Sequence, residues 1–338
     1  MSQKLLIVQS QERSFLKRVT QTSQLDTRTE TSQKGNRIVF AKLITTMILW
    51  GFAWPVGRFL AIDLPPISIA TIRYAIVVPV FFLVLWLREH SIGIPRAWTL
   101  SLLVMGLLNT TLYQAFFLFG VRYAAASDDS LVIGIGPVLI AILAAFALKE
   151  ALTRWKIVGL MTGLAGVATI SLLSPNVKVI NRPLGIALVF GGAVSYAFYT
   201  IILRRFINKT RANLTSQQAP SSLRIISWVS LLGWLFLIPF SLVESPWNYP
   251  WTMESWLGIL YLAIFSTIIG YLFFVDGVIQ IGASRTAIFS SLVPVFGVVS
   301  SYLVLGETLS IWHAASFLLI FLGVIFVNRK KKPVTVAR

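Results

Sequence analysis

Ten long apolar segments, separated by short polar breaks, constrain this chain more than any other feature of its sequence. A helix needs about 20 consecutive, mostly apolar residues to cross the hydrocarbon core of a bilayer. The mean hydropathy is +0.79 and only 12% of the residues are charged, which is typical of a chain that lies in lipid. The predicted spans are residues 38–60, 67–87, 98–119, 124–148, 155–173, 184–203, 223–243, 255–275, 284–305 and 311–328.

The two ends of the chain lie outside these spans. Residues 1–37 are rich in Ser, Thr and Gln, and their apolar run from Leu5 to Val8 is far too short for the core of a signal peptide. They are expected to form a disordered cytoplasmic tail. Residues 329–338 begin with Arg-Lys-Lys-Lys and are expected to form a basic cytoplasmic tail at the anionic leaflet. The sequence has no cysteine, which excludes disulfides and thiolate metal sites.

The positive charges decide which way the spans run. Cytoplasmic loops of membrane proteins carry an excess of Lys and Arg. With the N-terminus inside, most of the 29 Lys and Arg residues fall on the cytoplasmic side, and those predicted outside are Arg58, Arg122, Lys178 and Arg182. Both termini are therefore predicted to be cytoplasmic, in a multi-pass protein of the cell membrane. The net charge of +17 needs no nucleic-acid partner.

The chain repeats itself at an offset of 157 residues. The stretch GPVLIAILAAFALKEALTRW begins at Gly136, and VPVFGVVSSYLVLGETLSIW begins at Val293. Both contain Pro-Val and end on Glu-x-Leu, a hydroxyl residue, any residue and Trp. The same offset joins Thr110 to Thr267, Phe117 to Phe274 and Gly166 to Gly323, among other identities. One duplicated unit therefore accounts for both halves.

Each half contains five predicted spans, in residues 38–173 and 184–328. Because five is odd, the second half enters the membrane from the opposite side. The predicted fold is an all-α membrane protein of ten transmembrane helices, arranged as two inverted five-helix repeats. Inverted repeats are typical of secondary transporters, in which two halves rock about a site near the bilayer midplane.

Trp50-Gly51 in the first span, Arg73 in the second, and the Pro…Glu-x-Leu-[Ser/Thr]-x-Trp ending of both halves form a set of motifs across residues 38–328. With this set the sequence resembles the EamA-type transporters of the drug/metabolite transporter superfamily. The resemblance implies export or exchange of small metabolites, such as amino acids or amphipathic compounds, through a central cavity without ATP. The chain departs from the family pattern at Tyr196-Ala197, where Trp-Ala is common, and at Asp128-Asp129, where small residues are common.

Ionisable residues inside the spans are candidates for function, because a charge in lipid is costly and faces a partner or water. Arg73, Asp128 and Asp129 lie at similar depths in the outer leaflet. We expect Arg73 to pair with one of the two acids, and the other acid to take up a proton during transport or to meet a substrate ammonium group. A purely structural ion pair is the alternative. Asp276 and Arg285 are expected to form an inner pair.

Several further side chains have candidate roles. Pro137 and Pro294 are predicted hinges, since proline removes a helical hydrogen bond. Thr153 and Ser310 are expected to cap the fifth and tenth helices, with Glu150 and Glu307 near the same helix starts. Residues with polar groups within the spans are expected to contact the substrate, alongside Arg73: Trp50, Trp54, Asn109, Tyr113, Gln114, Tyr196, Tyr199, Thr267, Tyr271, Ser290 and Ser291.

No catalytic or metal site stands out. Neither His90 nor His313 has a second ligand at helical spacing, and no nucleotide-binding glycine motif is present. We therefore predict a transporter with a small-molecule substrate and no cofactor, and leave a homodimer open. The alternative from another class is a membrane transferase of lipid-linked groups that uses Asp128 and Asp129. A channel is disfavoured, because no ring of like groups lines one helix.

Overall fold

The computed structural model describes residues 37–147, 151–174, 178–213, 220–281, 286 and 289–329. Within these residues eight helices are long and apolar enough to cross a membrane, and two shorter apolar helices follow. The spans in chain order are Arg37–Asp63, Pro66–Glu89 (α2), Arg96–Tyr123 (α3, η2 and α4), Ala126–Ala147 (α5, η3 and α6), Arg154–Leu173 (α7), Arg182–Thr210 (in α8), Ser222–Val243 (α9), Met253–Ile281 (α10, η5 and α11), Ser290–Leu305 (η6 and α13) and Ile311–Val327 (α14).

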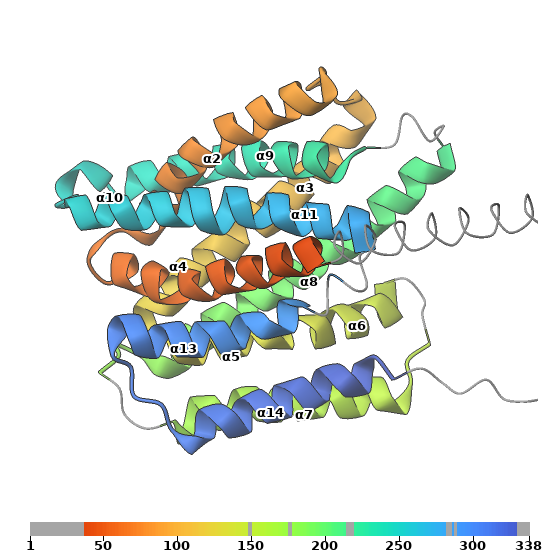
Figure 1. Cartoon of the computed structure of the whole chain (residues 1–338). Coiled ribbons are helices and arrows are strands. Elements are labelled where there is room, and N and C mark those ends of the chain that lie inside the picture. The colour runs from red at the N-terminus through yellow and green to blue at the C-terminus, as the bar shows by residue number, and fades with distance from the viewer. Residues whose placement is uncertain are drawn as a thin grey trace, which may run out of the picture.

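The helices run roughly alongside one another and pair across the two halves of the chain (Figure 1). The helix α7 packs along α14 at one edge of the bundle, and α2 packs along α9 at the opposite edge. Between them, α5 packs on α13 and α4 on α8. The all-α fold with ten helices is confirmed, and the cross-half pairing is what two inverted repeats produce.

Irregular turns occur at matching places in the two halves. A 3-10 turn, η3 (Ile133–Ile135), precedes Pro137, and η6 (Ser290–Leu292) precedes Pro294 at the repeat offset. A π-helical segment, η2 (Leu107–Leu112), interrupts the third span, and η5 (Tyr261–Ile269) interrupts the eighth. Such π segments are rare and occur frequently at functional sites.

The pair α2 and α9 is joined at both ends by acidic side chains. At the outer end, the Glu244 carboxylate after α9 accepts hydrogen bonds from the backbone N–H of Ile67 (3.0 Å) and Ser68 (2.7 Å) in the first turn of α2. At the inner end, Glu89 at the close of α2 accepts from the Ser221 hydroxyl, which caps α9, and pairs with Arg224 (2.7 Å). Glu244 therefore caps the start of α2, whereas the start of α9 is capped by its own Ser221, which Glu89 holds in place.

The pair α7 and α14 meets along small residues. A Cβ added to Gly323 would lie 2.7 Å from the Gly159 carbonyl oxygen, so the two backbones touch directly. The predicted caps are present at the starts of these helices. The Thr153 hydroxyl accepts from Lys156 N–H (3.3 Å), and Ser310 forms a capping box with His313.

Some predicted boundaries differ from the observed ones. The third, sixth and eighth spans are longer than predicted because polar residues at their ends stay helical, as in the stretch after residue 203. Glu150 and Arg285 lie outside the described residues, as do most of both tails.

Candidate functional site

Arg73 occupies a buried position in the outer third of α2. Its Nε and Nη2 atoms donate to Thr267 Oγ1 (3.0 and 2.5 Å), and its Nη1 atom donates to Gln114 Oε1 (3.0 Å). Gln114 comes from α4 (Tyr113–Tyr123) and Thr267 from η5. The structure thus brings three of the predicted substrate contacts together from both halves of the chain.

Aromatic rings surround this group. Tyr271 in α11 (Gly270–Ile281) lies 5.7 Å from the Trp50 ring, between centroids. Tyr196 in α8 (Arg182–Asn213) lies 5.9 Å from Tyr113 and 5.7 Å from Tyr199. Together these rings form an aromatic cluster, defined here as Trp50, Tyr113, Tyr196, Tyr199 and Tyr271.

Other predicted contacts lie elsewhere or are held by packing. Trp54 is buried against Phe117 in an edge-to-face arrangement, with ring centroids 4.9 Å apart. Asn109 is buried within η2. Ser290 and Ser291 are partly exposed in η6, on the cytoplasmic side of Pro294. The Cγ atom of Pro294 would lie 3.0 Å from a Cβ added to Gly134, so the segments containing the two predicted hinges touch.

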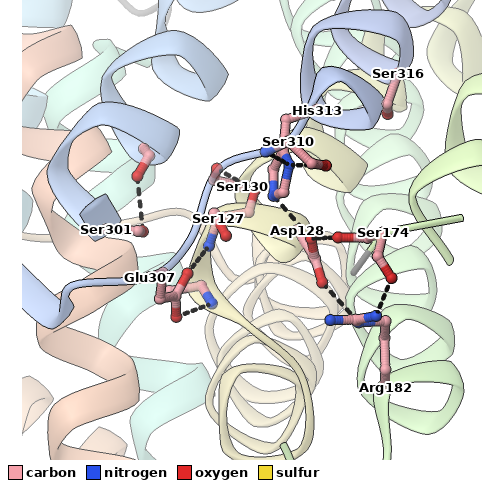
Figure 2. Close-up of polar contacts among 12 residues, drawn as sticks. Ser127, Asp128, Ser130, Ser174, Arg182, Ser301, Glu307, Ser310, His313 and Ser316 are labelled. Atoms are coloured by element: carbon pink, nitrogen blue, oxygen red, sulfur yellow. Dashed lines mark hydrogen bonds and ion pairs between the residues drawn. The ribbon is translucent and has the colours of Figure 1, made fainter. Parts of the chain in front are cut away.

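Asp128 forms a second polar group, near the outer ends of the helices (Figure 2). Its Oδ2 atom lies 3.0 Å from Arg182 Nε in α8, and its Oδ1 atom lies 3.2 Å from His313 Nε2 in α14. The Ser174 hydroxyl donates to Oδ1 (3.3 Å). The backbone N–H of Ser310 donates to His313 Nδ1 (3.1 Å), so the ring proton of a neutral His313 lies on Nε2, facing Asp128.

Glu307 holds the same end of the bundle from the other half. Its carboxylate accepts from the backbone N–H of Ala126 and Ser127 (both 2.9 Å), the first residues of α5 (Ala126–Val132), and lies 3.3 Å from Arg58 Nε. Arg58 also donates to the carbonyl oxygens of Val121 and Ala124. Glu307 therefore serves the start of the fourth span, whereas the sequence suggested the start of the tenth.

Asp129 lies beside these groups with neither carboxyl oxygen hydrogen-bonded to any described residue, although its side chain is 0% exposed. The charged groups near it are Asp128, Arg58 and Glu307. We call Arg58, Asp128, Asp129, Arg182, Glu307 and His313 the outer cluster.

The predicted pairing of Arg73 with Asp128 or Asp129 is wrong. Arg73 faces α4 and η5, whereas Asp128 faces α8 and α14. At the inner end, Asp276 pairs with Lys42 (2.9 Å), and its predicted partner Arg285 lies outside the described residues. Sequence reasoning also missed Arg58, Arg182, His313 and Glu244 as partners, because no local motif connects them to the groups that they contact.

Equivalent residues of the two repeats differ in burial. At the outer end of the third span, Gln114, Phe117, Leu118 and Val121 are buried. Their repeat equivalents at the inner end of the eighth span are all partly exposed: Tyr271, Phe274, Val275 and Val278. In the equivalent turns η3 and η6, Ile135 is buried, whereas its repeat equivalent Leu292 is exposed. The bundle is therefore closed at its outer end and more open at its cytoplasmic end.

Comparison with known proteins places this architecture in a family. The profile of the EamA-like transporter family matches residues 38–172 and 183–329. This chain belongs to that family. It is a multi-pass protein of the cell membrane whose biochemical role is transport and not catalysis, so the transferase alternative is set aside.

Relatives cover nearly the whole chain. The chain is 30% identical over 289 residues to the uncharacterized transporter YvbV of Bacillus subtilis, covering 85% of this chain and 90% of the relative. It is 26% identical over 293 residues to a probable amino-acid metabolite efflux pump of Salmonella typhimurium, covering 84% and 92%. A crystal structure with 19% identity aligns with a TM-score of 0.59 over 86% of this chain and 96% of the solved one, which supports the fold.

Proposed function

We propose that this EamA-family protein is a secondary-active exporter of small organic metabolites that works by alternating access. The observation that carries the proposal is the unequal burial of equivalent residues in the two repeats. If the repeats exchange their conformations, the closed end and the open end exchange as well. One chain holds both repeats and every group involved, so the proposal needs no second subunit.

The substrate site in this proposal is the group around Arg73 and the aromatic cluster. Trp50, Tyr196 and Thr267 lie near the middle of their spans, where a carrier binds its solute. Arg73 contacts Thr267 from the outer third of α2. Rings with polar edges suit amphipathic or aromatic solutes. The name of the Salmonella relative, a probable amino-acid metabolite efflux pump, points to the same class.

Charge balance in the outer cluster gives a role for a proton. Arg58 and Arg182 balance Asp128 and Glu307, while His313 presents Nε2–H to Asp128 as a neutral ring would. An ionised Asp129 would then be a buried charge with no hydrogen-bond donor among the described residues, which is costly. We propose that Asp129 is protonated while the outer end is closed, and that it ionises when water reaches the cluster.

The test is flux into sealed proteoliposomes that contain the purified protein. A labelled panel of amino acids, aromatic acids, neutral amides and cationic drugs would be measured with and without an imposed pH gradient. Saturable flux of one class supports the carrier, and uphill flux driven by the gradient supports proton coupling. No flux of any class above that of protein-free liposomes would contradict the transporter mechanism proposed.

The variant Asp129→Asn tests proton coupling independently of transport in the same assay. Asparagine keeps the shape of the protonated acid but cannot ionise, so we expect flux that no longer changes with external pH. Asp63→Asn, an exposed acid at the outer end of the first helix, is the matched control and should behave as the wild type. Unchanged pH dependence in Asp129→Asn would show that Asp129 does not titrate during transport.

A further inference from the structure

The buried guanidinium of Arg73 has only neutral acceptors. The side chain is 5% exposed, and its hydrogen bonds go to the Thr267 hydroxyl and the Gln114 amide oxygen. Its electrostatic neighbours are the phenol groups of Tyr74, Tyr113 and Tyr271. A full positive charge therefore lies about 10 Å from the outer end of α2, counting 1.5 Å per residue from Pro66.

No carboxylate of the described residues lies within ion-pair distance of Arg73. The interior acids are engaged elsewhere: Asp128 with Arg182, Glu307 with Arg58 and the start of α5, and Asp276 with Lys42. Asp129 lies in the outer cluster, where its positive neighbour is Arg58. A buried, uncompensated charge destabilises a fold, and inside a membrane protein such a residue marks a functional site.

The acceptors of Arg73 are themselves fixed. Thr267 Oγ1 donates its proton to the Leu262 carbonyl oxygen (2.8 Å), and Gln114 Nε2 donates to the Tyr74 hydroxyl (3.2 Å). Arginine has five N–H donors. The two hydrogen bonds of Arg73 to Thr267 and the one to Gln114 use three of them. One N–H on each terminal nitrogen is left without an acceptor among the described residues. The side chain is therefore fixed in position, and each of its terminal nitrogens has one unused N–H donor.

Solvent reaches the neighbouring aromatic cluster from inside the bundle. Tyr196 is 37% exposed. The outward face of α8 carries the exposed Leu184 and Phe198, and Tyr196 lies roughly 160° around the helix from Phe198 at 100° per residue. Its exposed surface therefore faces the other helices and not the lipid, so a solute can reach this ring without crossing lipid.

We propose that Arg73 is the anion-binding residue of the substrate site, and that the transported solute carries a carboxylate attached to an aromatic or other planar apolar group. A carboxylate matches two N–H donors on the terminal nitrogens of a guanidinium and supplies the missing counter-charge. The rings of the aromatic cluster cover the apolar part. This inference rests on the proposed function, because it names the substrate class of the same central site.

Matched acids and amides test the inference. Binding of 3-phenylpropionate, indole-3-acetate and phenylalanine, and of the amide of each, would be measured by isothermal titration calorimetry on the purified full-length protein. We expect at least one acid to bind about tenfold or more tightly than its amide, in line with charge-assisted hydrogen bonds. Arg73→Gln should remove that preference. Arg73→Lys should keep part of it, since lysine has the positive charge but lacks the paired N–H donors of the guanidinium group.

Two controls keep the result interpretable. Arg88→Gln removes an exposed arginine from the cytoplasmic end of the same helix and should retain the preference for the acid. Arg73→Gln should have an apparent melting temperature no lower than the wild type, because it removes an uncompensated charge. A lower value with an unchanged acid preference would mean that Arg73 is structural.

The failures of the two proposals differ. Equal binding of acid and amide by the wild type, or binding of none of the three acids, overturns the inference about Arg73. Flux of neutral or cationic solutes in the proteoliposome panel would leave the carrier standing in that case. No flux of any class would contradict the carrier itself.

Discussion

Two adjacent aspartates in one helix occupy opposite chemical situations. Asp128 has an arginine, a histidine and a serine as partners, whereas Asp129 has no hydrogen bond to any described residue. Both side chains are fully buried. Their replacement by asparagine, which conserves shape, is therefore expected to have opposite consequences for stability.

Asp128→Asn should destabilise the protein by about 3–5 kcal/mol, the usual cost of removing one partner of a buried ion pair, here the pair with Arg182. Asp129→Asn should be neutral or stabilising. It loses no hydrogen bond, and an amide, unlike the carboxyl group, does not have to be protonated to stay uncharged when buried. Apparent melting temperatures in detergent at neutral pH would measure both. Adding Arg182→Gln to Asp128→Asn should recover part of the loss; equal melting temperatures for the two single variants would contradict the assignment of partners.

At the residue scale, counting from predicted helix starts misplaced the two aspartates. The count put Arg73, Asp128 and Asp129 at similar depths, but α5 begins at Ala126, so Asp128 lies in its first turn, whereas Arg73 lies seven residues into α2. The count also could not give the rotation of each helix about its axis, and Arg73 turns toward Thr267 while Asp128 turns toward Arg182. The caps Thr153 and Ser310 were predictable because a cap acts within four residues. Glu307 was not, because it caps a helix 180 residues away in the chain.

At the element scale, acidic side chains at both ends tie α2 and α9 into one unit. Glu244 accepts three hydrogen bonds at the start of α2, two from backbone N–H and one from the Ser68 hydroxyl (2.8 Å). At the opposite end, Glu89 accepts from the Ser221 hydroxyl and pairs with Arg224. Sliding α2 along α9 would uncover the start of α2 and break the contacts of Glu89.

Glu244→Ala is expected to cost about 1–2 kcal/mol, the usual range for loss of a helix cap. Glu244→Gln keeps one oxygen acceptor and should lose less. The melting temperature in detergent is the measurement, with Asp63→Ala as the control for removing an exposed acid on the same side. A Glu244→Ala variant as stable as that control would show that the cap does not matter for the fold.

The periodic features of the elements were accessible from sequence, and their irregularities were not. Ten apolar runs and a constant offset predicted the helices and their duplication. The π segments η2 and η5 could not be predicted, because Leu107–Leu112 and Tyr261–Ile269 have no composition that separates a π-helical turn from an α-helical one. They are recognised only in the structure, where the backbone hydrogen bonds join residues five apart instead of four.

At the scale of the whole molecule, the bundle is more open at one end than at the other. The outer end is closed by the outer cluster and by Glu244, while the repeat-equivalent inner end leaves Tyr271 and Phe274 partly exposed. The resting protein is therefore expected to face the cytoplasm. The chain contains no cysteine, so single cysteines can report this directly.

Tyr196→Cys should react with a membrane-impermeant maleimide added from the cytoplasmic side, in inside-out vesicles. Ser127→Cys, buried in the first turn of α5, should be protected from the same reagent added from outside. Substrate gradients that favour the outward-facing state should reverse the two rates. Fast labelling of Ser127→Cys from outside, together with a protected Tyr196→Cys, would mean that the resting state faces outward.

The first half of the chain depends on the second for two of its helix caps, and this affects how the protein folds while it is being synthesised. Glu244 and Glu307 complete the starts of α2 and α5, yet both lie in the second half of the chain. A ribosome releases the first five helices before either glutamate has been made. Until then, water or lipid head groups must cover the exposed N–H groups of those two helix starts. The first half therefore reaches its finished hydrogen bonding only after Glu244 and Glu307 of the second half have been made.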